Sequence, residues 1–429
     1  MAKSVAYINN VIHELEKVQT LESVSKKLSP LTKEDIEKLK HTSYSTKPGK
    51  VGYEERTEFL KAKDKRIDSI TKSQHFEDFD SLNGNIENFI GMAQIPIGLA
   101  GPLLVNGKDA SGDYHIPLAT TEGALVASYS RGMKACRLSG GITSVCLVEG
   151  VQRSPFFKFD NIATVGIFIK WVHEHSEMFK QIVTETSRFA KLNEINSNIE
   201  GNSVILTFEF QTGDAAGQNM VTICTDRICN YIFKNFKIQP REWYIESNYS
   251  GDKKATALSF SNVRGKKVTA EIVLPRDIVR DVLKTTPEKI EKYWIASTLA
   301  VTQSGAIGAQ GHVANGLTAL FIACGQDVAC ISESSVGITR METNQDGNLY
   351  AALTLPSLIV GTIGGGTNLP TQKECLELID CHGVGKARKF AEICCAVALA
   401  GEISIASAMS VDHFTSAHEK LGRKKDGSK

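Results

Sequence analysis

The pattern of apolar and polar residues divides the chain into segments of different secondary structure. Residues 1 to about 86 are rich in charge and show helical spacing in "LTKEDIEKLK" and "YEERTEFLKAKDKRID", with a Gly/Pro break at "STKPGKVG" between them. We expect a small helical arm here. From about residue 87, "ENFIGMAQIPIGLAGPLLVNG" is β-rich and punctuated by glycine, and an amphipathic helix is predicted from Ala124 onward.

Strand and helix patterns alternate between about residues 155 and 245. The segment "ATVGIFI" predicts a strand, "EHSEMFKQIVTETSRFAKLNEI" a helix, "NSVILTFEFQT" a strand and "NMVTICTDRICNYIFKNF" a helix. This β-α-β-α order predicts a compact two-layer module of the ferredoxin-like type, inserted into a larger domain.

The remainder of the chain combines a polar loop, "ESNYSGDKKATALSFSNVRGKK", a strand, "VTAEIVLP", and small-residue helices from Ile290 to about Leu320. The most apolar stretch, "EICCAVALAGEISIASAM", carries Glu402 near its middle and is followed by polar residues. This pattern favours a buried helix over a bilayer span. The polar tail "DHFTSAHEKLGRKKDGSK" is expected to be flexible.

Composition excludes several classes of protein. The chain has 429 residues, of which 42% are hydrophobic and 23% charged, which is typical of a folded globular protein with more than one domain. A net charge of +1 predicts neither a nucleic-acid nor an anionic membrane partner. The N-terminal "MAKSVAYINNVIHELEKVQ" lacks the apolar core of a signal peptide, so we expect a soluble, cytoplasmic protein. Ten cysteines without a CxxC pair predict reduced core thiols and no metal site.

Common nucleotide and hydrolase motifs are missing from the sequence. It contains no Walker A pattern, no GxGxxG after a strand, no GxSxG and no HExxH. The glycine run in "GTIGGGTNLP", residues 361–370, permits close approach either to a ligand or to another backbone segment.

Four polar segments, "TTEGALVAS", "GDKKA", "ACGQDVA" and "FTSAHEK", place Glu122, Lys253, Asp327 and His418 beside glycine or small residues. Each also has an ordinary structural interpretation. Glu122 could be a helix-start carboxylate, Lys253 a solvated loop residue, Asp327 a turn residue after an apolar helix, and His418 a surface histidine. A catalytic interpretation therefore depends on the four occurring together.

The segments "ENFIGMAQIPIGLAGPL", "ATTEGALVAS", "TGDAAGQNM", "FIACGQD" and "GTIGGGTNLP", in this order, closely resemble the catalytic domain of 3-hydroxy-3-methylglutaryl-CoA (HMG-CoA) reductases of the class that includes eukaryotic and archaeal enzymes. The resemblance covers roughly residues 85 to 423. It implies reduction of HMG-CoA to mevalonate and free CoA with two NADPH. The alternatives are a reductase acting on another acyl thioester and a catalytically silent CoA-binding scaffold.

The resemblance implies a role for each of the four ionisable residues. Lys253 would stabilise negative charge on the thioester oxygen. Glu122 would donate a proton, with its pKa raised by apolar neighbours. Asp327 would hold the lysine and tune the glutamate, and His418 would protonate the departing CoA thiolate from the flexible tail.

Binding residues are implied in the same way. An arginine would favour the 2′-phosphate of NADPH, and the residues expected at the cofactor are Ser187, Arg188, Asp214, Asn219, Gly364, Gly365 and Gly366. The residues expected at the CoA phosphates are Arg131 and Lys134, and those at the hydroxymethylglutaryl group are Arg153, Lys254 and Asn315.

The sequence departs from the family pattern at three places. The family lysine that binds the far carboxylate of the substrate falls, by ungapped counting from Asn315, on Ile295, which could mark an alignment shift or a buried helix face. A family serine before "DKK" falls on Glu246, with Ser247 next to it. The regulatory serine of animal enzymes would fall near Lys424, and we expect no membrane anchor like that of those enzymes. The acyl substrate and the regulation therefore stay open.

The expected fold class is α+β. In the family the site lies between subunits, so the resemblance implies a homodimer-based tetramer. The expected parts are a helical arm (1–86), a large catalytic domain (87–154 and 256–418), an inserted NADP-binding domain (155–245), a catalytic loop (246–255) and a flexible tail (419–429).

Overall fold

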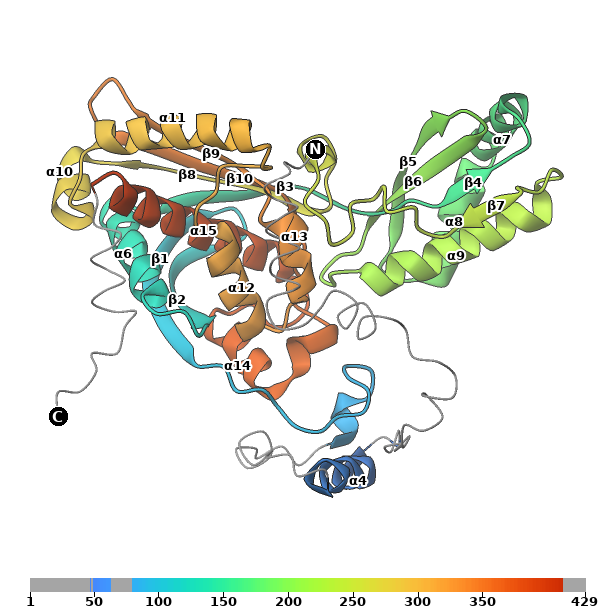
Figure 1. Ribbon diagram of the computed structural model, residues 1–429, viewed down its shortest axis with the longest axis horizontal. Helices are drawn as coiled ribbons and strands as arrows, with labels where there is room; N and C mark the ends of the chain where they lie inside the picture. Colours follow the sequence, from blue (N-terminus) through green and yellow to red (C-terminus); the bar gives the residue numbers. More distant parts are fainter. Residues whose placement is uncertain (1–46, 48, 63–78, 412–429) are drawn as a thin grey trace, which may run out of the picture. The chain divides into compact units, whose positions relative to one another are not determined.

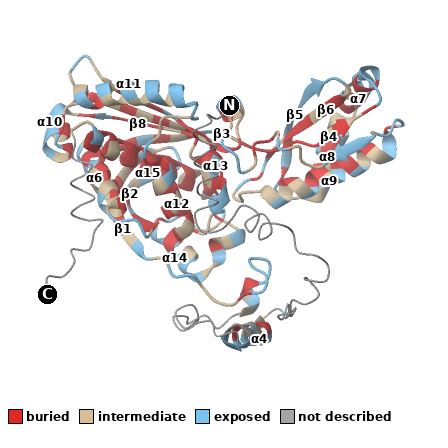
Figure 2. Ribbon diagram, in the orientation of Figure 1, coloured by how far each residue is buried: buried red, intermediate tan, exposed pale blue. Residues whose placement is uncertain are grey.

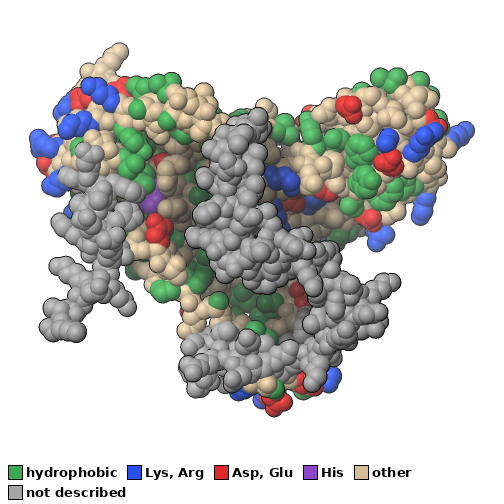
Figure 3. All heavy atoms as spheres, in the orientation of Figure 1, with side chains coloured by type: hydrophobic (Ala, Val, Ile, Leu, Met, Phe, Trp, Pro, Cys, Tyr) green, Lys and Arg blue, Asp and Glu red, His purple; other side chains and the backbone are tan. Residues whose placement is uncertain are grey.

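The computed structural model describes residues 47, 49–62 and 79–411, and the chain forms two compact units, Met1–Met92 and Ala93–Lys429. The segment "LTKEDIEKLK", His418 and the predicted tail lie outside the described residues. Helices and strands are both abundant in the second unit (Figure 1), which confirms the α+β class. On the face shown in Figure 3, acidic and basic side chains are interspersed.

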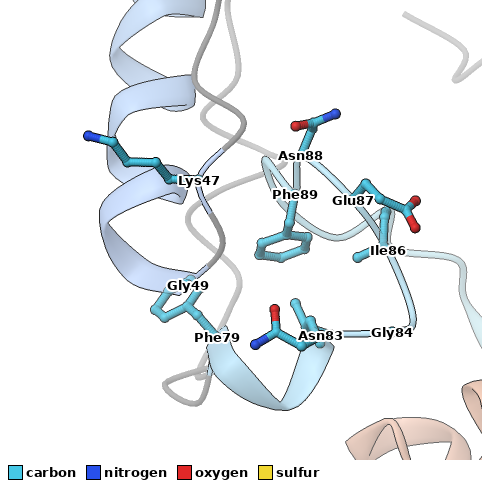
Figure 4. Close-up of a pocket in the computed structure, with 10 residues that line it drawn as sticks. Lys47, Gly49, Phe79, Asn83, Gly84, Ile86, Glu87, Asn88 and Phe89 are labelled. Atoms are coloured by element: carbon cyan, nitrogen blue, oxygen red, sulfur yellow. The ribbon is translucent and has the colours of Figure 1, made fainter.

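The first unit contains helix α4 (Gly49–Ala62) and the short helix η1 (Phe79–Leu82). The Tyr53 ring of α4 packs on Phe79 and Phe89, with ring centroids 4.9 and 5.6 Å apart. Residues of both segments line a cavity of about 170 Å³ (Figure 4). Helix α4 begins within the predicted Gly/Pro break, four residues before the helix expected at Tyr53.

The larger core of the second unit is built on a mixed sheet. Strands β1 and β2 pair antiparallel, β1 and β3 pair parallel, and β3, β8, β10 and β9 follow in antiparallel order. The strands are β1 (Ile97–Gly107), β2 (Ser111–Ala119), β3 (Ile142–Arg153), β8 (Gly265–Leu274), β9 (Ile338–Thr343) and β10 (Leu349–Leu358).

Helix α15 lies at the centre of this core. It contacts strands β3, β8 and β10 and helices α6 and α12, and Figure 2 shows it buried over most of its length. Among the described helices it alone has the length and apolar composition to cross a membrane, but 94% of its apolar window is buried inside the protein. The helices of this part of the chain are α6 (Leu125–Leu138), α10 (Arg276–Ile278), η3 (Val279–Leu283), α11 (Pro287–Ser304), α12 (Val313–Ala323), α13 (Ile331–Ser334), α14 (Pro370–Leu378) and the central α15 (Ala387–Met409).

The structure explains the single acidic residue in the middle of this apolar stretch. The buried Glu402 carboxylate accepts hydrogen bonds from the backbone N–H groups of Gly311 (3.1 Å), His312 (2.5 Å) and Val313 (2.8 Å). These N–H groups stand at the start of α12, where they have no partner within the helix. Glu402 therefore joins two core helices.

We expect Glu402→Gln to lower the free energy of unfolding by about 2 to 4 kcal/mol, because the amide has one acceptor oxygen and no charge for three backbone donors, two of them buried. Thermal unfolding followed by circular dichroism measures the change. Glu174→Gln, at the exposed last residue of helix α7 (Ile162–Glu174), is the matched control. Equal melting temperatures for both variants would contradict the anchoring role.

A second hydrophobic core contains residues between Val151 and Phe236. Its antiparallel strands lie in the order β7, β4, β6 and β5, and the order of elements along the chain is β-α-α-β-β-α-β, as in ferredoxin-like modules. The division of the second unit into domains stays a prediction. The elements are β4 (Phe156–Lys158), α7 (Ile162–Glu174), α8 (Ser176–Thr186), β5 (Lys191–Glu200), β6 (Ser203–Gln211), α9 (Gln218–Asn235) and β7 (Glu242–Tyr244).

Strand β3 connects the two cores. Its residues 143–150 pair with β8 of the larger core, whereas residues 151–153 pair with β6 of the second core. Arg153, the last residue of β3, therefore lies where the cores meet.

The strand predicted for "ATVGIFI" is wrong, because this segment lies in helix α7. The side chain of Asn161 caps the helix by accepting from Thr164 N (3.0 Å). Val165, Phe168 and Val172 are buried at helical spacing. A short apolar run does not distinguish strand from helix, and the cap decides the outcome.

The long helix predicted for "EHSEMFKQIVTETSRFAKLNEI" is wrong in its second half. Helix α8 ends at Thr186, and Lys191–Glu200 forms strand β5. The Ser187 hydroxyl accepts from the backbone N–H groups of Phe189 and Ala190, both at 3.2 Å, which closes a turn after the helix.

Candidate active site

Lys253 and Asp327 lie side by side, as the sequence predicts for a catalytic pair. Lys253 Nζ is 3.2 Å from Asp327 Oδ2, and the two side chains are 49% and 44% exposed, so a ligand can reach both. The hydrogen bond that Lys253 donates to Asp327 raises the pKa of Lys253, which favours the charged ammonium. Asp327 is itself fixed by its Oδ1, which accepts from Ala329 N (3.0 Å) at the start of η4 (Val328–Cys330).

A buried polar network holds the backbone of Lys253. Its N–H donates to Glu333 Oε1 (3.1 Å), which also pairs with Arg264 Nε (3.4 Å). Glu333 is fully buried, and burial raises the pKa of its carboxyl. Arg264 also pairs with Asp252, the residue before the lysine. Lys253 adopts a left-handed conformation with φ of 56°, which these contacts sustain.

The sequence pattern does not mark Arg264 and Glu333 as site residues. Both belong to polar stretches, "NVRGKK" and "ISESS", without the periodic apolar pattern that indicates burial. Nevertheless they are 3% and 0% exposed. Arg264 contacts Asp252, 12 positions away in the sequence, and Glu333 contacts the backbone of Lys253, 80 positions away, so the fold brings them to the loop.

The Arg153 guanidinium forms ion pairs with carboxylates of the same chain. Its Nη1 lies 3.1 Å from both Glu246 Oε2 and Asp252 Oδ2. The arginine side chain is 7% exposed. Lys254, the other cation expected at the acyl group, is exposed, and its Nζ donates to the backbone oxygen of Asp252 (2.8 Å).

Glu122 is exposed in the turn before α6. In a single chain, its apolar neighbours therefore do not bury it as expected. Thr121 and Gly123 are exposed with it, while Leu125, the first residue of α6, turns to the core. Within the described residues the Glu122 carboxylate makes no hydrogen bond, and its N–H donates to Thr120 Oγ1 (3.0 Å). The residue does not cap α6, whose N-cap is Ala124.

Asn315 lies in the first turn of α12, where its Nδ2 is 3.3 Å from His312 Nδ1. Burial, with a smaller contribution from Arg131, lowers the pKa of His312 to about 4. The ring is therefore neutral near pH 7.

Of the two cations expected at the CoA phosphates, Arg131 is turned into the protein. Its guanidinium donates to the backbone oxygen of Ser404 (2.6 Å) and to its hydroxyl (2.9 Å). Lys134, one helical turn further along α6, is exposed. Lys134 is thus the more accessible of the two.

Asp214 connects the second core to the glycine-rich loop. Its carboxylate accepts from the N–H groups of Gly385 (2.8 Å) and Ala387 (3.1 Å), and its backbone oxygen accepts from Thr362 N (2.8 Å). Asn219 is exposed in the first turn of α9. Asp214 therefore has a structural role in bringing the candidate cofactor segments together.

Arg188 is exposed at the turn that Ser187 closes, and the neighbouring Phe189 ring is 59% exposed. A cavity of about 440 Å³ lies beside this turn, and its lining includes Phe189, Gly213 and Arg388. Phe189 directly follows Arg188 and Gly213 directly precedes Asp214, and both Arg188 and Asp214 are expected at the cofactor.

The glycine run leaves room for close approach to a ligand at some positions and permits close backbone packing at another. Gly364 and Gly365 are exposed with φ of 74° and 54°, and a Cβ on either would meet nothing within 4 Å. A Cβ on Gly366 would lie 2.9 Å from the backbone oxygen of Gly325. The first two glycines face open space, whereas the third permits tight backbone packing.

Ile295 lies on α11 with 47% of its surface exposed. It is therefore not a core residue. All ten cysteines are buried and free, and among the described residues no cluster of three or more His, Cys, Asp or Glu could hold a metal ion.

Comparisons with known proteins agree over most of the chain. The family "Hydroxymethylglutaryl-coenzyme A reductase" matches residues 52–423. The 3-hydroxy-3-methylglutaryl-coenzyme A reductase of Pyrococcus horikoshii is 44% identical over 349 residues, which are 80% of this chain and 84% of that one. The corresponding enzyme of Methanocaldococcus jannaschii is 42% identical, with 80% and 86% covered.

A solved structure agrees in fold. The class II 3-hydroxy-3-methylglutaryl-CoA reductase from Streptococcus pneumoniae, bound to NADPH in open conformations, matches with a TM-score of 0.63 and 20% identity over 83% of this chain and 86% of that one. The fold and the matches together define an enzyme of the oxidoreductase class. The chain belongs to the hydroxymethylglutaryl-coenzyme A reductase family.

Proposed function

We propose that this protein catalyses the NADPH-dependent four-electron reduction of HMG-CoA to mevalonate and free CoA. The observation that carries the proposal is the accessible Lys253–Asp327 pair, held over a buried polar network in a chain of this family. A fixed ammonium is the group that a thioester reduction requires where negative charge develops on oxygen.

The proposed roles follow from the chemistry of each side chain. The cofactor, when bound, supplies the hydrides. Lys253 stabilises the oxyanion, and Asp327 keeps the lysine charged and oriented. Glu122 donates the proton that the oxygen takes up, once substrate or a second subunit covers its exposed carboxyl. We assign protonation of the CoA thiolate to His418, which lies outside the described residues.

The described residues fit a dinucleotide phosphate. The exposed glycines 364 and 365 leave room for close approach to backbone N–H groups, and the cavity of about 440 Å³ lies beside Phe189 and Gly213. We propose that Arg188 binds the 2′-phosphate, with Ser187 and Asp214 positioning the segments around it.

We expect Arg188→Ala to raise the KM for NADPH about tenfold or more, while the KM for NADH changes little, because only NADPH carries the extra phosphate. Steady-state kinetics with both cofactors measures the difference. Equal changes in the two KM values would show that Arg188 does not bind that phosphate.

The decisive experiment follows NADPH oxidation with HMG-CoA as substrate and identifies mevalonate as product. Oxidation with another acyl-CoA but not with HMG-CoA would favour a related reductase, and CoA binding without turnover would favour a scaffold. We further propose a cytoplasmic enzyme that assembles as a homodimer-based tetramer, for which sedimentation analysis is the test.

A further inference from the structure

Arg153, proposed to contact the acyl group, has its positive charge already balanced. Its Nη1 contacts both Glu246 and Asp252 at 3.1 Å, and its Nη2 donates to the backbone oxygen of Gln218 (3.4 Å). Within the described residues its Nε is buried without a partner. An incoming carboxylate that reaches this guanidinium would therefore compete with two carboxylates that already neutralise its charge.

The polar network around Arg153 contains more carboxyl groups than guanidinium groups. Two guanidinium groups, Arg153 and Arg264, contact three carboxyl groups, Glu246, Asp252 and Glu333. A further carboxylate placed here meets like charges in a poorly hydrated environment, which disfavours binding.

Of the two carboxylates on Arg153, Glu246 is the exchangeable one. Asp252 is shared with Arg264, so it stays neutralised in any rearrangement. Among the residues that the structure describes, Arg153 is the one cation paired with Glu246, whose Oε2 also accepts from Ser154 N (3.3 Å) and the Ser250 hydroxyl (3.1 Å). Its Oε1 is buried without a partner among the described residues.

We propose that Glu246 determines acyl specificity: it acts as an internal carboxylate that competes with the carboxylate of an acyl-CoA for Arg153. The inference rests on the proposed function and concerns the same site. Its consequence is that the enzyme gains little from a carboxylate on its substrate. Exposed Ile295 offers no charge in compensation. Lys253 and Lys254 of the loop are both exposed, but Lys253 is paired with Asp327, which leaves Lys254 as the cation available to a substrate carboxylate.

The test compares HMG-CoA with 3-hydroxy-3-methylbutyryl-CoA, which lacks the carboxylate. In the unaltered protein we expect the specificity constants for the two thioesters to differ by less than about tenfold. Glu246→Gln keeps the shape and an acceptor oxygen but removes the charge. We expect it to lower the KM for HMG-CoA by about tenfold relative to the KM for the neutral thioester.

Two further variants separate charge from structure. Glu246→Asp retains the charge and should keep the discrimination of the unaltered protein, whereas a purely structural role of Glu246 would make both variants lose activity with both thioesters. Glu242→Gln removes an exposed carboxylate that pairs with Lys158, and serves as the matched control with no change expected.

The outcomes distinguish the two proposals. Absence of turnover with either thioester in the unaltered protein refutes the proposed function. Turnover with a preference for HMG-CoA above about a hundredfold refutes the role of Glu246 even if no variant folds. Turnover of both, with equal effects of Glu246→Gln on the two KM values, also refutes it.

Discussion

Lys253→Ala is expected to lower kcat for HMG-CoA reduction by about 10² to 10³, the usual effect of removing one oxyanion donor. The alanine side chain cannot reach the oxygen, and Asp327 would be left as an uncompensated negative charge beside the reacting group. Binding of CoA should change much less, because the Lys253–Asp327 pair acts on the negative charge that develops on the thioester oxygen during the reaction. Single-turnover kinetics with saturating cofactor isolates this step.

Lys170→Ala provides the matched control, since this exposed lysine of α7 makes only a 3.9 Å ion pair with Glu174. Circular dichroism should show the same fold for both variants. A loss below about tenfold in Lys253→Ala would indicate a solvated loop lysine rather than an oxyanion donor.

The proximity of Lys253 and Asp327 was predictable, because the motifs that carry them resemble a family in order and sequence. What holds the lysine in place was not. Arg264 and Glu333 are buried charges that stabilise each other and the loop only after segments far apart in the chain have packed. No local pattern of polarity marks a charged residue whose partner lies 69 positions away.

The errors in secondary structure have a local cause. Apolar runs identify a buried segment but leave its backbone conformation open, as "ATVGIFI" shows. In that segment the hydrogen bond from Thr164 N to Asn161 identifies the helix. At Ser187, another polar residue instead ends helix α8 and closes the turn that precedes strand β5. Capping chemistry therefore carries information that the hydrophobic pattern lacks.

At Glu402 the sequence did predict the outcome: a single acidic residue indicated that the apolar stretch around it is a buried helix. A carboxylate within an apolar stretch disfavours a membrane span, and in the fold it accepts three backbone hydrogen bonds at the start of α12. Its partners could not be inferred, because they lie about 90 residues earlier in the chain.

The exposure of Glu122 limits how it can act as a proton donor. A carboxyl group in open solvent is a poor proton donor near neutral pH, so efficient donation requires that the group be covered when substrate binds. In this chain, Thr121 and Gly123 leave the carboxyl uncovered, and the described residues offer it no hydrogen bond. The covering groups must come from substrate, from the segment beyond residue 411 or from a second subunit.

Glu122→Gln is therefore expected to abolish mevalonate production, with kcat reduced by about 10² or more, while CoA affinity stays within a few fold of the unaltered protein. The amide keeps the shape of the side chain but cannot deliver a proton. Because the group is exposed and does not cap α6, the variant should also melt at the same temperature. Product analysis and calorimetric CoA titration together test this. Near-normal turnover would exclude Glu122 as the acid, whereas loss of CoA affinity equal to the loss of turnover would make it a binding residue.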